Sequence, residues 1–65
     1  MKDYTRTEIE WAIDEYILNE RNRKIMRRRL IDGVCFEPLS EEFDISPRQA
    51  KRIVYKCEEI IFRHI

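Results

Sequence analysis

The side chains best suited to chemistry in this sequence are gathered in residues 46–56, SPRQAKRIVYK. The set comprises Ser46, Arg48, Gln49, Lys51, Arg52, Tyr55 and Lys56. On a helix, these cations and the Tyr55 hydroxyl project from one broad face, and no acid follows until Glu58. Arg and Lys bind phosphates and guanine edges, and Gln pairs with adenine. The pattern predicts a surface that binds double-stranded DNA through the major groove, although a cationic helix face that is only solvated is the alternative.

Groups for catalysis, metal binding or cofactor binding are sparse. The only histidine is His64, beside the C-terminus, and the two cysteines, Cys35 and Cys57, complete no metal-ligand motif with it. No nucleophile has a base near it in a recognisable motif. We therefore expect no enzyme activity, no metal, no cofactor and no small-molecule substrate.

The basic stretch is predicted to lie on a helix over residues 46–63. Ser46, Pro47 and Gln49 supply an N-cap, a first-turn proline and the third-position partner of a capping box. Apolar residues then recur at helical spacing: Ala50, Ile53, Val54, Cys57, Ile60 and Ile61. One face of this helix should be buried, with the cations on the other.

A shorter helix is predicted just before it, over residues 37–43. Phe36, Leu39 and Phe43 fall on one stripe, and Ser40 is small enough for a second helix to approach closely. Asp44 then stands where the chain must turn, since Asp tolerates a left-handed backbone better than most residues. Residues 36–57 therefore indicate a helix-turn-helix unit.

Residues 20–61 contain a longer pattern of spaced residues that resembles the pattern of a known protein family. Its matching positions are Arg29, Leu30, Gly33, Phe36, Leu39, Ser40, Glu41, Phe43, Ile45 and Ser46. The run resembles the C-terminal DNA-binding region of bacterial sigma factors and of small sigma-like phage and mobile-element regulators. It departs from them at Asp44, where glycine is common, and at Pro38 and Ser40, where Glu and Ala are common, although Ser40 is still small. A hydroxyl cap is also common near the position of Phe36. The resemblance implies that Arg48, Gln49, Lys51 and Arg52 face base edges or phosphates.

A first helix is predicted over residues 5–18, because Thr5 and Glu8 form a capping box. Its core stripe comprises Ile9, Ala12, Ile13, Tyr16 and Ile17. A second row, Tyr4, Trp11 and Leu18, is spaced by seven residues and projects from roughly the opposite side. Either the ends of the bundle cover this row, or it is an exposed partner or dimer surface.

A second helix is predicted over residues 20–32, between an Asn19 N-cap and a Gly33 stop. Arg29 falls within its apolar stripe, so we expect it to pair with Glu41 or Glu37 and fix the angle between two helices. The remaining cations are expected to point outward: Arg21, Arg23, Lys24, Arg27 and Arg28.

At 65 residues, the chain is predicted to be one all-α domain of four helices (1–65), in which 1–19 support the helix-turn-helix unit. Net charge is zero but comes in blocks: residues 1–20 hold two cations and six acids, 21–33 six and one, 34–45 none and four, and 46–65 five and two. The polar, acidic N-terminus and the lack of a long apolar run favour a cytoplasmic protein without membrane contact.

Two functions fit these patterns. The first is a DNA-binding transcriptional regulator, acting as a homodimer or with RNA polymerase. The second is an adaptor that uses the same scaffold to bind a protein such as RNA polymerase.

Overall fold

The computed structural model describes residues 4–64, which contain four α-helices. They are α1 (Arg6–Tyr16), α2 (Glu20–Met26), α3 (Phe36–Glu42) and α4 (Pro47–His64), and a π-helical segment, η1 (Arg27–Ile31), continues α2. No strand occurs among these residues, so the prediction of a small all-α fold is confirmed. None of the described helices combines the length and apolar character needed to cross a membrane.

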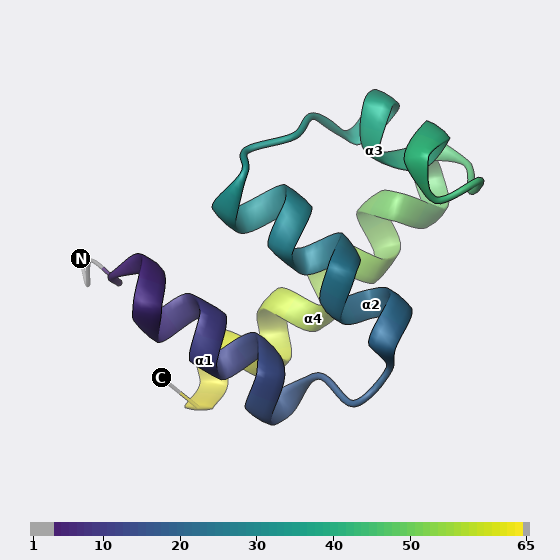
Figure 1. Ribbon diagram of the computed structural model, residues 1–65. Helices are drawn as coiled ribbons and strands as arrows, with labels where there is room; N and C mark the ends of the chain where they lie inside the picture. The colour runs from purple at the N-terminus through teal and green to yellow at the C-terminus, as the bar shows by residue number, and fades with distance from the viewer. Residues whose placement is uncertain (1–3, 65) are drawn as a thin grey trace.

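The longest helix, α4, packs against α1, α2 and α3. Its 18 residues extend about 27 Å, which is most of the 30 Å length of the molecule. Its first turns pack beside α3, and its last turns lie beside α1 (Figure 1). The first turns of α4, which carry Arg48, Lys51 and Arg52 of the predicted basic surface, are therefore at the α3 end of the molecule.

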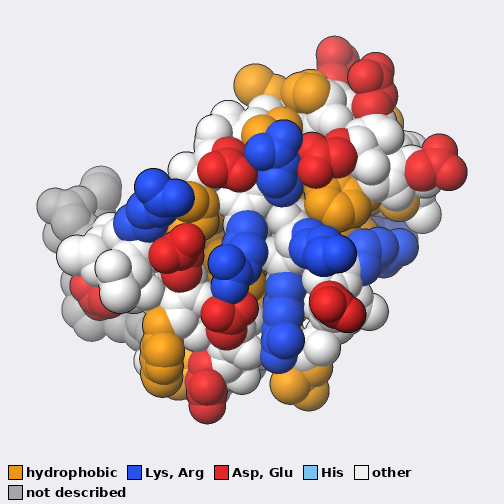
Figure 2. Space-filling model, in the orientation of Figure 1, with side chains coloured by type: hydrophobic (Ala, Val, Ile, Leu, Met, Phe, Trp, Pro, Cys, Tyr) orange, Lys and Arg blue, Asp and Glu red, His pale blue; other side chains and the backbone are white. Residues whose placement is uncertain are grey.

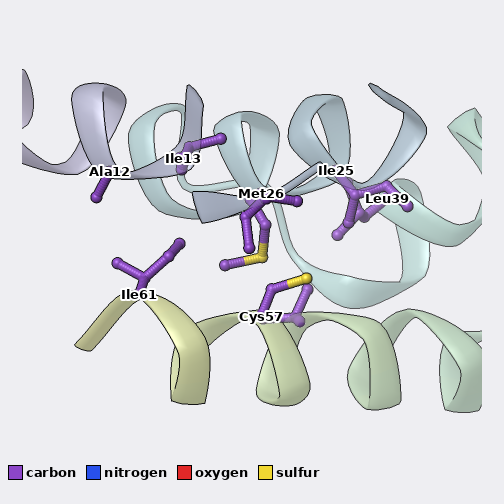
Figure 3. Close-up of a cluster of buried hydrophobic side chains, with 9 residues drawn as sticks. Ala12, Ile13, Ile25, Met26, Leu39, Cys57 and Ile61 are labelled. Carbon is purple, nitrogen blue, oxygen red and sulfur yellow. The ribbon is translucent and has the colours of Figure 1, made fainter. Parts of the chain in front are cut away.

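One hydrophobic core lies between α4 and the other helices. Figure 3 shows side chains of α1, α2 and α3 meeting those of α4. The buried apolar residues are Ala12, Ile13, Ile17, Ile25, Met26, Leu39, Ala50, Val54, Cys57 and Ile61. Burying an Ile-sized side chain contributes about 1.5–3 kcal/mol, so this cluster supplies most of the folding drive. The apolar stripe predicted for residues 50–61 is thus the buried face of α4.

All three predicted N-caps are present. The backbone N–H groups of Glu8, Asn22 and Gln49 each donate to the cap side chain three residues earlier, at 3.1 Å. Those acceptors are Thr5, Asn19 and Ser46. Side-chain caps satisfy backbone donors that otherwise have no partner, which is why these starts can be read from sequence.

The end of α1 differs from the prediction, which placed it at residue 18. The helix ends at Tyr16, and Ile17 is already extended, with φ −99° and ψ 110°. The guanidinium of Arg23, on α2, donates to the carbonyls of Ile17 and Asp14. Carbonyls at the end of a helix have no N–H donor within the helix, so the cation from α2 stabilises the end of α1 at Tyr16.

The second helix has the predicted extent but not the predicted geometry. Its last turn is π-helical, and the N–H of Asp32 donates to the carbonyl of Arg27, five residues back, at 3.2 Å. Gly33 follows with φ 70°, and the N–H of Val34 closes on the carbonyl of Arg28 at 3.0 Å. The wider turn rotates the side chains after Met26 relative to a straight α-helix.

Candidate nucleic-acid interface

The turn between α3 and α4, residues 43–46, sets the direction of α4 relative to α3. Asp44 has φ 55°, the left-handed backbone expected of it. The N–H of Ile45 donates to the carbonyl of Ser40 at 2.9 Å, and Ser40 is only 3% exposed. Because Ser40 and Ala50 are both small and buried, α3 and α4 approach closely at this point.

The exposed side of α4 carries four cations, Arg48, Lys51, Arg52 and Lys56, which we call the α4 outer face together with Tyr55. None of the four makes an ion pair with any carboxylate among residues 4–64. Tyr55 is 57% exposed on the same side. This face is therefore a group of cations without protein counter-charges.

In the other basic block, residues 21–29, the two arginines at positions 27 and 28 are paired with acids. Arg27 pairs with Asp14, and Arg28 pairs with Glu42 at 2.9 Å and with Asp32 at 3.0 Å. Hydrogen bonds to these carboxylates raise the pKa of both arginines. The face drawn in Figure 2 accordingly shows Lys and Arg interspersed with Asp and Glu. Arg27 and Arg28 do project outward, with side chains 42% exposed, but each is bound to a carboxylate, and Arg23 is bound to the main-chain carbonyls at the end of α1.

Two of the predicted DNA-binding residues have structural tasks. The Oε1 of Gln49 accepts from the N–H of Ser46, and the Oγ of Ser46 accepts from the N–H of Gln49, both at 3.1 Å. A bidentate contact to adenine uses both ends of a Gln carboxamide, and here one end is engaged by the cap. Gln49 retains its amide donor, and Ser46 retains its hydroxyl proton.

The remaining predicted residues lie across the width of the helix. Arg48, Arg52 and Tyr55 follow one another along its centre at helical spacing. Lys51 lies on the side of Phe36, with its Nζ 5.8 Å from the ring centroid. Lys56 lies on the other side, where it lines a groove with residues of the α1–α2 connection. The predicted set is thus one helix face with two distinct edges.

The predicted ion pair of Arg29 with Glu41 or Glu37 is absent. The Nη1 of Arg29 instead donates to the carbonyl of Val34 at 3.1 Å, and its guanidinium lies 4.3 Å from the ring centroid of Phe36. The π-helical turn rotates this part of the chain, so that Arg28 is the residue that reaches α3, at Glu42. An ion pair does connect the two helices, but it joins Arg28 to Glu42, each of which is next in sequence to a predicted residue.

Arg29 therefore joins Lys51 at the same aromatic ring, an arrangement the sequence reading missed. Tyr55 completes the group, with its ring edge-on to Phe36 at 5.9 Å. The sequence shows two cations, Arg29 and Lys51, and two aromatic residues, Phe36 and Tyr55. They belong to three different elements, and no rule of sequence spacing predicts that their side chains meet.

The predicted row of Tyr4, Trp11 and Leu18 is not one surface. Tyr4 stacks on Phe62, at the end of α4, with ring centroids 5.3 Å apart. Leu18, 84% exposed, lies beyond the end of α1, so helical spacing does not align it with Trp11. Trp11 remains 54% exposed and contacts Tyr16 edge-on. The ends of the bundle thus cover one member of the row and leave the other two separate.

The C-terminal histidine is part of this packing. His64 is still helical, and its ring stacks on that of Tyr16, with the ring centroids 4.2 Å apart. In residues 4–64, no group of three or more His, Cys, Asp and Glu side chains could hold a metal ion.

Comparison with other proteins adds no further constraint. No protein family model, no characterised protein and no solved structure matches the chain. The sigma-like resemblance therefore stays a prediction, and the function has to be argued from the charges and geometry of α3 and α4.

Proposed function

We propose that the chain is a DNA-binding module that regulates transcription, with α3 and α4 acting as a helix-turn-helix and α4 entering the major groove. The observation that carries the proposal is the α4 outer face, whose four cations have no carboxylate partner among the described residues. The same fold neutralises Arg27 and Arg28 with acids. Cations left without counter-charges on one helix suit a polyanionic partner.

The dimensions of α4 suit this role. A helix with side chains is about 10–12 Å across, and the major groove of B-DNA is about 12 Å wide. Arg48, Arg52 and Tyr55 occupy the first turns of α4, which are anchored to α3 by the Asp44 turn. In this arrangement, Arg48 and Arg52 contact base edges or phosphates, and Lys51 and Lys56 contact the two flanking backbones.

The affinity should depend steeply on salt. If four side chains each neutralise one phosphate, the slope of log K against log salt concentration is roughly −3 to −4. Zero net charge gives no general attraction to DNA, so binding by a single copy should be weak. A dimer or a complex with RNA polymerase would raise the effective affinity.

The test is fluorescence anisotropy of a short labelled duplex of random sequence, titrated at several salt concentrations. We expect wild type to bind with a steep salt dependence and the double variant Arg48→Glu, Arg52→Glu to lose binding. The matched control is Arg6→Glu, Arg63→Glu, which makes the same change in net charge at the opposite end of the molecule (Figure 1). Equal losses in both double variants would mean that net charge alone matters and would refute the assignment of α4.

Exposed apolar residues favour the second candidate, a protein-binding adaptor. Trp11 is 54% exposed on α1, and Leu18 is 84% exposed after it. Apolar docking would change little with salt, unlike binding to phosphates. Absence of DNA binding at low salt, together with binding to purified RNA polymerase that Trp11→Ala abolishes, would establish the adaptor instead.

A further inference from the structure

Two cations from different elements converge on the ring of Phe36. The guanidinium of Arg29, in η1, lies 4.3 Å from the ring centroid, and the Nζ of Lys51, in α4, lies 5.8 Å from it. Neither has a carboxylate within ion-pair distance among residues 4–64. Two like charges on one small aromatic platform repel each other, and no ion pair with a carboxylate in the described chain offsets that repulsion.

The platform holds Arg29 in a fixed position. One end of its guanidinium donates to the carbonyl of Val34 at 3.1 Å while the planar group covers Phe36. That hydrogen bond occupies Nη1 and leaves the Nε and Nη2 donors without a partner in the described chain. A guanidinium whose orientation is already fixed loses little freedom on binding an oxyanion.

Lys51 and Tyr55 supply further donors next to the same ring. Lys51 is exposed and carries three N–H donors on a flexible stem. Tyr55 contacts the ring edge-on at 5.9 Å and is 57% exposed. The three side chains come from two separate segments of the chain, η1 and α4, and Phe36 at the start of α3 brings them together.

We propose that Arg29 and Lys51, positioned by Phe36, form a clamp for one backbone phosphate of the bound duplex. This inference rests on the proposed function and extends it to a residue outside the α3–α4 unit. The clamp holds the backbone beside the Lys51 edge of α4, which sets the angle at which Arg48 and Arg52 enter the groove. Phosphate contacts of this kind fix register without reading sequence.

The competing explanation is that Arg29 is only a structural link between η1 and α3. Such a link would affect the melting temperature but not the number of ions released on DNA binding. The slope of log K against log salt concentration counts the phosphates neutralised and therefore separates the two explanations.

The experiment measures binding of the labelled random duplex over a range of KCl for wild type, Arg29→Met, Lys51→Met and the double variant. If the two cations hold one phosphate together, each single variant and the double variant lower the magnitude of the slope by about one. Its loss of affinity should be smaller than the product of the two single losses, each about three- to tenfold, because the cations share a ligand. Arg63→Met, a cation on the last turn of α4, is the matched control and should leave the slope unchanged.

Two further variants keep the test independent of folding. Lys51 is exposed, so Lys51→Met reports on the clamp in a stable fold. Arg29→Lys keeps the charge but loses the planar fork, so it should restore the slope even where thermal unfolding shows lower stability. A slope that stays at the wild-type value in the double variant overturns the clamp, as does a fall of about two, which indicates separate phosphates.

The outcomes also separate the clamp from the proposed function. If Arg48→Glu, Arg52→Glu abolishes binding and the clamp variants behave like wild type, the DNA-binding function stands and the clamp is wrong. If wild type does not bind the duplex at low salt, both are wrong. Inorganic phosphate, titrated at constant ionic strength, should not displace the duplex. Displacement would show a site for a free anion and would overturn the assignment to backbone phosphate.

Discussion

The two cysteines occupy contrasting environments. Cys57 is 4% exposed in the core, where burial raises the pKa of its thiol. Cys35 is exposed at the N-cap position of α3, and neither thiol is in a disulfide. Because the thiolate is the reactive form, burial and a raised pKa both make Cys57 inert.

We therefore predict that only Cys35 reacts with a thiol reagent such as DTNB in the folded protein. Cys57 should react at the rate of unfolding, and denaturant should release the second equivalent. Cys35→Ser is the control, in which the fast phase disappears and the slow phase remains. Fast labelling of two thiols in the native state would contradict the buried position of Cys57.

The same thiol predicts a loss of stability at alkaline pH. A pKa that is higher in the folded than in the unfolded chain means that the folded state holds its proton more tightly. This stabilisation is complete below the unfolded pKa of about 8.5 and declines as the pH rises through the folded value. Urea unfolding at a series of pH values above 8 should show the decline in wild type, and Cys57→Ala should lack it while being less stable throughout.

Side-chain partners were the part of the site that the sequence could not predict. Cations at 48, 51, 52 and 56 could be placed on one helix face because helical spacing alone decides it. Arg29 was assigned the wrong partner because its direction depends on a π-helical turn, which has no simple sequence signal. Because the helix is rotated there by a fraction of a turn, the guanidinium of Arg29 lies on the Phe36 ring and not beside Glu41.

At the level of elements, the turn between α3 and α4 is under backbone strain at one residue. Asp44 has φ 55°, and a left-handed backbone costs a non-glycine residue about 1–2 kcal/mol. Glycine removes this cost but loses more conformational entropy on folding, about 0.5–1 kcal/mol. The position therefore tolerates few side chains.

We predict that Asp44→Gly leaves the free energy of unfolding equal or raises it by up to about 1 kcal/mol. Asp44→Val should lower it by about 1–2 kcal/mol, since a β-branched residue is a poor fit to this backbone. Chemical denaturation measures both, and Asp44→Asn, which tolerates the same backbone without the charge, is the control. A destabilising glycine would show that the Asp44 carboxylate itself supports the turn.

Helix starts and helix ends were predictable to different degrees. The starts at Thr5, Asn19 and Ser46 follow from caps formed within four residues of sequence, so the sequence contains the whole interaction. The end of α1 depends on Arg23, which reaches back from the next helix. Ends that rely on such tertiary contacts are not visible in local sequence.

For the whole molecule, the arrangement of charge matters more than its sum. The α4 outer face is basic, while the neighbouring α3 exposes Glu37 and Glu41, which make no ion pair among residues 4–64. In the proposed complex, a duplex bound on α4 would bring its phosphates near these acids, and like charges repel across distances up to the Debye length, about 8–10 Å. The acids therefore oppose docking modes in which α3, rather than α4, lies against the backbone.

This repulsion can be measured directly. Glu37→Gln, Glu41→Gln should raise affinity for random duplex about three- to tenfold at low salt, and the gain should fade as salt screens the charges. The matched control is Glu15→Gln, Glu20→Gln, which removes two exposed acids from α1 and the start of α2 and should change affinity less. If both pairs raise affinity equally, DNA responds only to net charge, and α3 has no part in orienting the complex. A gain specific to the α3 pair would mean that these acids limit non-specific binding, so that stable binding requires the correct fit of α4 in the groove.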